Sequence, residues 1–518
     1  MTTADSNIGT AGSAGKATGT VELTSFNRFM ILVVIMMSTI VIALDMSIAT
    51  IALPHMQGGL SATQDQVAWV MTSYLVSMAI MIAYTGWLAN RIGRKRLLVG
   101  ALTVFSIGAI FSGQASTLEE MILFRVIQGM AAAPVFPLAQ AIILDSFPRE
   151  RQGQVIALWG VGVMTAPVLG PVVGGWVTGT FDWRWVFYLG VPIGFIAAFM
   201  ASAFIIDVGQ KHRRKFDWIG FTALATVLAS VQLMLDRGHS QGWFESTEVV
   251  IEAAIIVLGL YVFVTQTVTS RNPIFARSIF VNANYMIGLV FAFMVGAFML
   301  SGNYVLTVFL QNIQGYPVTE AGVMLAPRAF GTMLGLLVVG MTITRTDPRA
   351  LIAIGFALVS VSAYMLAQIN SDIGAIDFAI LTMFNGFGSG LIWAPMITLM
   401  FSTLAPAHRT EGSTLVNLIR GYGSGVGISV AAVVLTRTTA VAYAELTATI
   451  TPYNEVLRMP QAMSAWNLDS VPSMAALEIE IVKQATTIGV LNTFILMTIA
   501  AALVVPLALL LKRPSENG

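Results

Sequence analysis

Long apolar runs recur along almost the whole chain, and they constrain its fold more than any other feature. The run from Phe29 to Leu53 contains a single charged residue and is long enough, as a helix, to cross a hydrocarbon layer of ~30 Å. Only 10% of all residues are charged, whereas soluble domains carry about 25%. The chain is therefore predicted to be an all-α membrane protein with many spans.

Fourteen apolar spans can be traced, and the loops between them carry an uneven charge. Most of the 27 Lys and Arg residues fall in tails and loops on the side of both termini. Since basic loops stay in the cytoplasm, both termini are predicted to be cytoplasmic. The predicted spans cover residues 29–53, 67–88, 97–113, 121–144, 155–179, 185–206, 218–235, 249–269, 285–310, 319–343, 350–368, 375–401, 414–436 and 486–511.

Several chemistries lack the residues they need. The chain has no cysteine, its four histidines form no ligand cluster, and no nucleophile elbow occurs. Gly15-Lys16 only faintly resembles a phosphate-binding loop, and no strand precedes it. A net charge of +1 gives no reason to expect nucleic acid. We expect no metal, no ATP-driven step and no enzyme. A membrane enzyme or non-transporting receptor remains the alternative from another class.

Two charged residues lie deep inside spans in the first half of the chain. Asp45 is placed within the first span and Arg125 within the fourth, and both fall in the outer half of the membrane. Charged residues at such depth are costly and usually face a protein interior or a wet cavity. We expect the two to face one cavity, where a proton and a substrate would compete. The alternative is that Arg125 extends to the membrane interface.

Two glycine-containing segments indicate tight turns and close helix contacts. The loop Gly86–Arg96 joins the second and third spans and carries a cluster of basic residues. In the fifth span, Gly162, Ala166, Gly170 and Gly174 repeat every four residues, and two prolines interrupt the same stretch. Such a stripe permits close packing, and the prolines allow the helix to bend. The pattern predicts a packed but movable joint.

Taken in order, these segments resemble the major facilitator superfamily, specifically its fourteen-helix drug:proton antiporter branch with EmrB-type pumps. The likeness covers about residues 28 to 512. The motifs that carry it are Leu44–Pro54, Gly86–Arg96, Phe124–Gly129, Gly170–Gly175, Trp183–Phe187, Val191–Gly194 and Met234–Phe244.

This resemblance implies the major facilitator fold, with 14 transmembrane helices arranged as two six-helix bundles plus two inserted helices. A segment similar to the Gly86–Arg96 loop occurs in the second half of the chain, at Gly340 and Arg345–Arg349. It agrees with an internal repeat of the two bundles. The expected organisation is a disordered cytoplasmic tail (1–27), a first bundle (28–207), a linker with the inserted helices (208–280), a second bundle (281–511) with a long outer loop (437–485), and a cytoplasmic tail (512–518).

The resemblance also implies roles for particular residues. Asp45 corresponds to the acid that couples protons and Arg125 to the arginine that relays them. Gly170, Pro171 and Gly174 match the antiporter motif, and Gly86, Asn90, Arg91, Gly93 and Arg94 match the conformational latch. The latch normally has an aspartate at the position of Asn90. We expect Asp145 to pair with Arg91 or Arg94, or else to be a solvated charge at a helix end.

The implied function is proton-coupled efflux of hydrophobic or amphipathic compounds across the inner membrane, with no cofactor. The alternative is transport of a specific metabolite or organic anion, because Arg328 and Arg420 give the deep interior more cations than anions. Either arginine could instead be structural, paired with backbone carbonyls. A periplasmic adaptor of the EmrA type and an outer-membrane channel are implied partners. The deep polar residues expected to line the substrate cavity are Gln128, Asn303, Arg328, Asn385, Asn417 and Arg420.

Overall fold

A computed structural model describes residues 24–206, 216–238, 241–450 and 470–511. Every regular element in these residues is helical, and no strand occurs among them. The elements are α1 (Ser25–Gly59), α2 (Gln64–Ile92), α3 (Arg94–Gln114), α4 (Leu118–Ala132), α5 (Val135–Ser146), α6 (Arg149–Thr180), α7 (Trp185–Tyr188), α8 (Gly190–Phe204), α9 (Trp218–Arg237), η1 (Trp243–Glu245), α10 (Thr247–Thr269), α11 (Arg277–Val281), α12 (Ala283–Val308), η2 (Phe309–Ile313), α13 (Val318–Thr342), α14 (Pro348–Leu366), α15 (Ala375–Ser402), η3 (Pro406–His408), α16 (Arg409–Thr449), α18 (Val471–Val504) and η5 (Val505–Leu510).

Thirteen of the described helical segments are long and apolar enough to cross a membrane. They correspond to thirteen of the predicted spans, and α4 with α5 counts as one of them. The other predicted span, 155–179, lies in α6, a helix of 32 residues. Four side chains of α6, at 167, 168, 171 and 172, lie outside the description. The all-helical membrane fold is confirmed, whereas the number fourteen stays a prediction.

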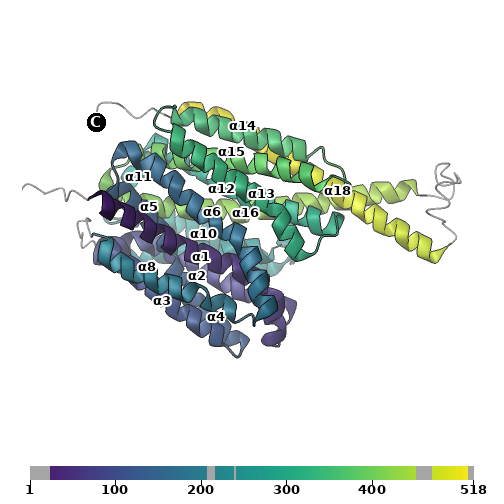
Figure 1. The fold of residues 1–518 in the computed structure, drawn as a ribbon, viewed down its shortest axis with the longest axis horizontal. Helices are drawn as coiled ribbons and strands as arrows, with labels where there is room; N and C mark the ends of the chain where they lie inside the picture. The colour runs from purple at the N-terminus through teal and green to yellow at the C-terminus, as the bar shows by residue number, and fades with distance from the viewer. Residues whose placement is uncertain (1–23, 207–215, 239–240, 451–469, 512–518) are drawn as a thin grey trace, which may run out of the picture.

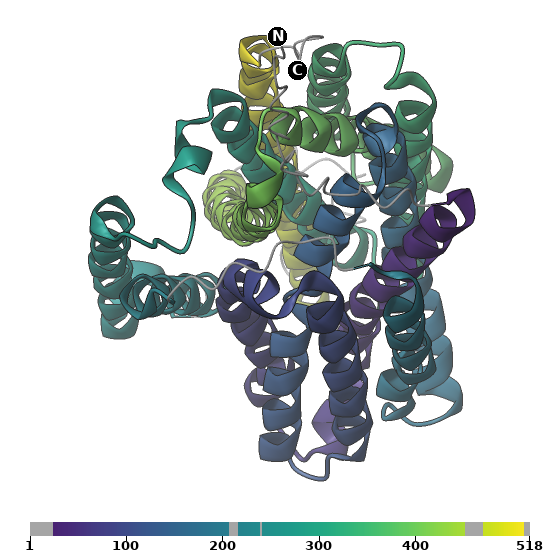
Figure 2. The ribbon, with the colours of Figure 1, turned by 90° about the vertical axis from the view of Figure 1, so that its left-hand side faces the viewer.

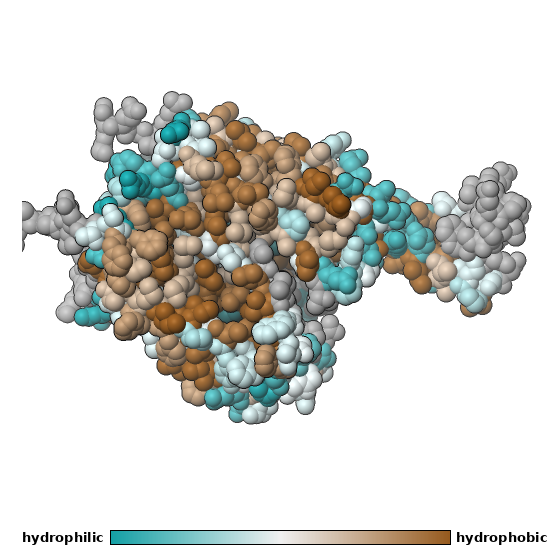
Figure 3. Space-filling model, viewed as in Figure 1, coloured by the Kyte–Doolittle hydropathy of each residue, from teal (hydrophilic) through white to brown (hydrophobic). Residues whose placement is uncertain are grey.

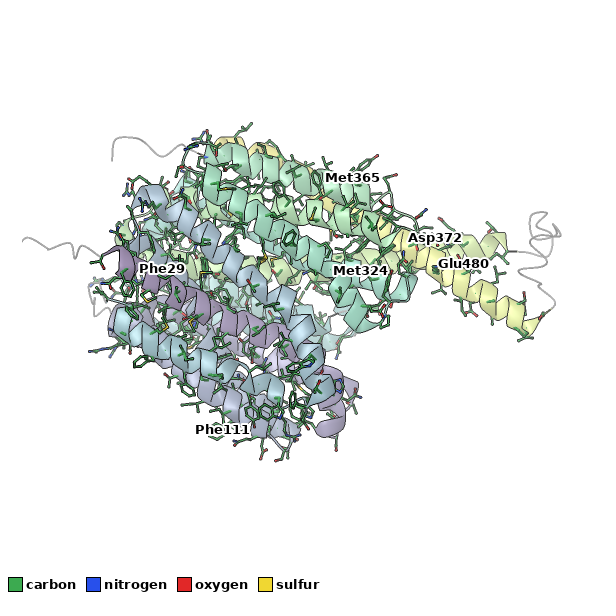
Figure 4. The ribbon with its side chains drawn as sticks, viewed as in Figure 1. Phe29, Phe111, Met324, Met365, Asp372 and Glu480 are labelled. Atoms are coloured by element: carbon green, nitrogen blue, oxygen red, sulfur yellow. The ribbon has the colours of Figure 1, made fainter. Side chains whose placement is uncertain are left out.

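The molecule has two distinct ends. The described part of the chain begins, with α1, and ends, after η5, at the same end of the molecule, which we call the termini side (Figure 1). At the opposite end, α16 and α18 extend beyond the other helices; this is the stalk side (Figure 1). On the face shown in Figure 3, the surface between the ends is largely apolar, and polar residues gather toward the ends. Phe29, Phe111 and Met365 are exposed apolar residues of this surface (Figure 4).

The predicted outer loop 437–485 is mostly helical where it is described. α16 continues to Thr449 and α18 begins at Val471, while residues 451–469 lie outside the description. The two extensions, 437–449 and 471–485, form the stalk, and Glu480 labels it in Figure 4. Alanine, the strongest helix former, accounts for seven of these 28 residues. Hydropathy marks where a helix leaves lipid, but it does not mark where the helix ends.

The first bundle consists of α1 to α8 and the second of α12 to α18. Between the bundles, α6 packs on α13 and α15, and α16 packs on α2 and α5. The inserted α9 contacts α2 of the first bundle and α16 of the second, and α9 and α10 stand beside the main body (Figure 2). Tyr422 Oη donates a hydrogen bond of 3.0 Å to Leu228 O, so α9 is tied to the second bundle by a polar contact.

Helix ends follow the expected local chemistry. The fourth predicted span divides at Ala133 and Pro134, because proline cannot donate the hydrogen bond that would continue α4. The predicted N-terminal tail (1–27) ends early, since Thr24 caps α1 and the helix begins at Ser25. Residues 1–23, 207–215 and 512–518, which complete the predicted tails and linker, lie outside the described residues.

Candidate functional site

Asp45 of α1 and Arg125 of α4 form a buried ion pair within the first bundle. Arg125 Nη1 lies 2.8 Å from Asp45 Oδ2, the arginine side chain is fully buried, and that of the aspartate is 4% exposed. Without its partner, either charge would be isolated in a region of low polarity, which is strongly unfavourable. The alternative prediction, in which Arg125 extends to the membrane interface, is therefore wrong.

Neutral groups surround the guanidinium on its other sides. Arg125 Nε donates to Val70 O at 3.3 Å, and Nη1 also donates to Gln128 Oε1 at 3.3 Å. The Tyr74 ring lies beneath the guanidinium, 4.3 Å from its carbon to the ring centroid. Tyr74 Oη and Gln128 Nε2 are buried polar atoms without a hydrogen-bond partner among the described residues. Arg125 is thus held by an acid, a carbonyl, an amide and an aromatic face.

A cavity of about 440 Å³ lies between the two bundles. Helices of both halves line it: α1, α5 and α6 from the first, and α12 to α16 from the second. Most of its wall is apolar and includes large rings and flexible thioethers, which suit adaptable binding of apolar molecules. Among these wall residues are Phe136, Trp159, Met164, Phe298, Phe356 and Trp393.

The structure divides the predicted cavity residues into two groups. Asn303, Arg328, Asn417 and Arg420 line the cavity. Gln128 does not belong to its lining and instead contacts Arg125 and accepts a hydrogen bond of 2.8 Å from Ser112 Oγ.

Asn385 also lies outside the cavity lining. Its Oδ1 accepts from Arg328 Nε at 3.1 Å, and its Nδ2 donates to Ser362 Oγ at 2.8 Å. Asn385 therefore supports Arg328 from behind.

Asp45 and Arg125 are absent from the cavity lining as well. The expectation that this pair faces the substrate cavity is wrong for this conformation. Ser47 and Thr50, which follow Asp45 on α1, do line the cavity. In a helix, residues two apart point in widely different directions, so α1 presents the acid to α4 and a different face to the cavity.

The small-residue stripe of α6 packs against that second region of α1. A Cβ atom at Gly170 would overlap the Ser47 side chain, and one at Gly174 would lie 3.0 Å from Ile48 Cγ2. The stripe therefore allows α6 to approach the helix that carries Asp45. Pro171 lies within α6, but its side chain falls outside the described residues.

A charged network connects the two bundles at the termini side. Gly93 has φ 96°, a left-handed value that suits glycine, and it alone separates α2 from α3. This tight turn places Arg94 at the start of α3, where it forms an ion pair with Asp145 of the same bundle. Arg409 Nη1 of the second bundle lies 2.8 Å from Asp145 Oδ1. One carboxylate therefore bridges a cation from each bundle.

Glu411 of the second bundle stands opposite the position where the latch lacks its aspartate. Asn90 Nδ2 lies 3.5 Å from Glu411 Oε1, and a Cβ atom at Gly86 would come within 3.3 Å of Glu411 Cγ. Glu411 Oε2 also accepts a hydrogen bond of 3.1 Å from the backbone of Ala276, in the segment that follows α10. Arg91 makes a different contact, over the ring of Trp87 at 4.9 Å.

Sequence reasoning missed three of these partners. Arg409 and Glu411 fall between the predicted spans 375–401 and 414–436, where charged residues are common. The asparagine at position 90 nevertheless indicated that the acid of the latch had to come from elsewhere. Gln140 gave no signal at all. Its Oε1 accepts a hydrogen bond of 3.1 Å from Asn417 Nδ2, which joins α5 to α16 next to the cavity.

Metal chemistry has no candidate within this site. Among the described residues, no group of three or more His, Cys, Asp or Glu side chains could hold an ion. The arrangement instead offers a buried ion pair, Asp45–Arg125, a largely apolar cavity, and a set of charged contacts around Asp145 that joins the bundles at the termini side.

Comparison with known proteins agrees with this geometry. Residues 35–428 match the sequence model of the Major Facilitator Superfamily. It is 31% identical to "Multidrug export protein EmrB" of Haemophilus influenzae, covering 88% of this chain and 90% of that protein. It is also 31% identical to the protein of the same name from Escherichia coli, over 81% of this chain and 82% of that protein.

Solved structures show the same fold at lower sequence identity. The human organic anion transporter MFSD10 superposes with a TM-score of 0.60, at 11% identity, over 92% of this chain and 99% of that one. At this identity the likeness concerns the fold alone. The sequence matches, which extend over most of the chain, carry the family assignment: the chain belongs to the major facilitator superfamily and is an EmrB-like member.

Proposed function

We propose that this EmrB-like protein exports hydrophobic and amphipathic compounds in exchange for protons, by alternating access. The observation that carries the proposal is the separation of an ionisable pair, Asp45 and Arg125, from an apolar cavity on another face of the same helix. The multidrug export proteins that the chain resembles support the substrate class. The family and the fold are those of transporters.

The termini side is proposed to be cytoplasmic and the membrane to be the inner membrane. The basic loops at this end support the orientation. The bundles are joined there by the Asp145–Arg409 pair and by Arg94 Nε, which donates to Thr410 Oγ1 at 2.8 Å. These contacts join the two bundles at the proposed cytoplasmic side. We propose that the described conformation precedes the uptake of a proton from outside.

Protonation of Asp45 is proposed to open the ion pair. A neutral carboxyl loses its charge attraction for the guanidinium, so the two side chains can separate. Arg125 keeps its neutral partners, Val70 O, Gln128 Oε1 and the Tyr74 ring. When Asp45 meets the cytoplasm, the proton leaves and the pair forms again. The gradient therefore drives the cycle, and no cofactor is needed.

Movement of α1 is proposed to transmit the state of the pair to the cavity. The glycines of α6 lie against Ser47 and Ile48, so a shift of α1 displaces α6, which itself packs on α13 of the second bundle. Ser47 and Thr50 would move with the acid and reshape the cavity wall. Protons and substrate would then compete through conformation rather than for one binding place.

An adaptor of the EmrA type and an outer-membrane channel are proposed to receive the exported compound. The stalk supports this, since Val441, Val471 and Ile479 are 58%, 75% and 70% exposed at the end of the molecule opposite the termini. The chain has no native cysteine, so a cysteine at Ile479 would be the only one. It should crosslink to the adaptor, whereas one at the termini-side residue Arg271 should not. Equal crosslinking from both would contradict the docking.

Transport into everted membrane vesicles tests the central proposal. Wild-type protein should accumulate a hydrophobic fluorescent drug when a proton gradient is imposed and should lose this activity when the gradient is dissipated. Asp45→Asn should remove the gradient-dependent part of transport. Undiminished gradient-dependent transport in this variant would refute Asp45 as the coupling residue. Absence of gradient-dependent transport by the wild type, over a broad panel of compounds, would refute the function.

A further inference from the structure

The substrate cavity carries an unbalanced positive charge. Arg328 and Arg420 both line it, and none of the described lining residues is acidic. Arg420 is the twelfth residue of α16 from its start on the termini side, so it enters the cavity about 16 Å along that helix. Arg328 reaches the same cavity from α13 of the same bundle. Two cations therefore face one apolar space with no carboxylate beside them.

Arg328 is fixed by neutral oxygens. Nε donates to Asn385 Oδ1 at 3.1 Å, Nη1 donates to Met299 O at 3.0 Å and to Asn303 Oδ1, and Nη2 donates to Phe298 O at 3.1 Å. These bonds satisfy most of its donors, but none of them neutralises its charge. Arg328 therefore acts as a fixed positive charge in the cavity wall.

Arg420 is held much more loosely. Nη2 has a marginal contact of 3.5 Å with Asn417 Oδ1, and the guanidinium carbon lies 5.3 Å from the centroid of the Trp393 ring. Its Nε is buried without a hydrogen-bond partner among the described residues. A buried donor that lacks an acceptor is unfavourable, so an acceptor delivered by a ligand would be favoured at this position.

We propose that Arg420 binds the anionic group of an amphipathic organic anion, such as a carboxylate or sulfonate attached to an apolar body. Guanidinium groups form paired hydrogen bonds with the two oxygens of a carboxylate. Arg328 adds attraction without giving up its own hydrogen bonds. The apolar body lies against Trp159, Phe298 and Phe356, which line the same space. This inference rests on the proposed function and names the substrate class of its cavity.

Binding of two dyes with opposite charge tests the subsite. Fluorescein and a cationic rhodamine ester share a xanthene ring, so their affinities for purified protein in lipid nanodiscs compare charge at similar apolar area. The wild type should bind the anion at least about tenfold more tightly. Arg420→Gln should lose about ten- to hundredfold in affinity for fluorescein, the range expected for hydrogen bonds to a charged group, and should bind the rhodamine as before.

Two further variants make the assay specific. Arg420→Lys keeps the charge but not the paired donors, so it should retain part of the anion affinity. Arg271→Gln removes an exposed arginine at the termini side and should leave both affinities unchanged. The subsite would be overturned if both Arg420 variants lost equal affinity for the two dyes, or if the wild type bound the cation more tightly than the anion.

Binding to nanodiscs is measured without a proton gradient, whereas transport into vesicles is measured with one. The anion subsite and the proton-coupled exporter can therefore fail independently. Charge-selective binding in the absence of gradient-dependent transport would leave the subsite standing and refute the exporter. Gradient-dependent transport of the rhodamine alone would leave the exporter standing and refute the anion subsite.

Discussion

Neutralising Asp45 should weaken the first bundle as well as stop proton coupling. The Arg125 side chain is fully buried, and its charged partner among the described residues, Asp45, lies 2.8 Å away. Breaking a buried pair by removing one partner typically costs about 3–5 kcal/mol. In Asp45→Asn, the amide oxygen can still accept from Arg125, and Val70 O and Gln128 Oε1 remain available. We therefore expect a loss near the lower end, about 3 kcal/mol.

A double variant separates the stability of the pair from its function. Asp45→Asn combined with Arg125→Gln replaces the ion pair with neutral groups of similar size, a change that is often close to neutral for stability. The double variant should therefore be more stable than Asp45→Asn alone. Independent effects would instead make it less stable than either single variant. The coupling between the two positions, obtained from the double-mutant cycle, should reach about 3 kcal/mol.

Reversible unfolding in detergent micelles measures the free energies, and everted vesicles measure transport by the same four proteins. Proton-coupled transport should be absent from all three variants, including the stable double variant. An Asp45→Asn protein as stable as the wild type would refute the pair as the structure places it. Gradient-driven transport by the double variant would refute its role in coupling.

Two other predictions concern the closure and the contact between α12 and α16. Asp145→Asn removes the charged acceptor that Arg94 and Arg409 share across the bundles. The bundles should therefore separate more often at the termini side, and a cysteine introduced at the buried position Ile343 should be alkylated roughly tenfold faster. Glu150→Gln, which changes an exposed acid nearby, is the control, and an unchanged alkylation rate in Asp145→Asn would contradict the role of Asp145 in joining the bundles. A Cβ atom at Gly423 would overlap a backbone carbonyl of α12, whereas one at Gly421 meets nothing within 4 Å. Gly423→Ala should therefore lower the free energy of unfolding by about 1–3 kcal/mol. Gly421→Ala should leave this free energy unchanged or raise it slightly. Equal effects of the two substitutions would refute the close contact between α12 and α16 at Gly423.

The sequence was sufficient for the membrane-spanning helices because their signal is one-dimensional. A run of apolar residues long enough to cross lipid has few alternatives to a helix. The same hydropathy signal failed at residues 437–449 and 471–485, where the helices continue as the stalk. Polarity rises in these segments while helix propensity stays high, so composition alone placed a loop there.

The site was only partly predictable, because it depends on which face of a helix meets which neighbour. The depth of Asp45 and Arg125 follows from counting residues, and the two side chains do meet. Their separation from the cavity does not follow from counting, since it depends on the rotation of α1 relative to α4 and α6. The asparagine at position 90 revealed that an acid was missing. Only the packing of α16 on α2 revealed Glu411 opposite it.

The placement of two sites on one helix limits how exchange can be enforced. If protons and substrate shared one space, charge repulsion and steric exclusion would suffice to make their binding alternate. Here Asp45 contacts Arg125 of α4 inside the first bundle, whereas Ser47 and Thr50 of the same helix line the cavity between the bundles. Under the proposed mechanism, alternation requires α1 to occupy one of two positions, one when Asp45 is protonated and one when substrate is bound. The glycines of α6 permit the position of α1 that the structure shows, because a larger residue at Gly170 would collide with Ser47 and push α1 away from α6.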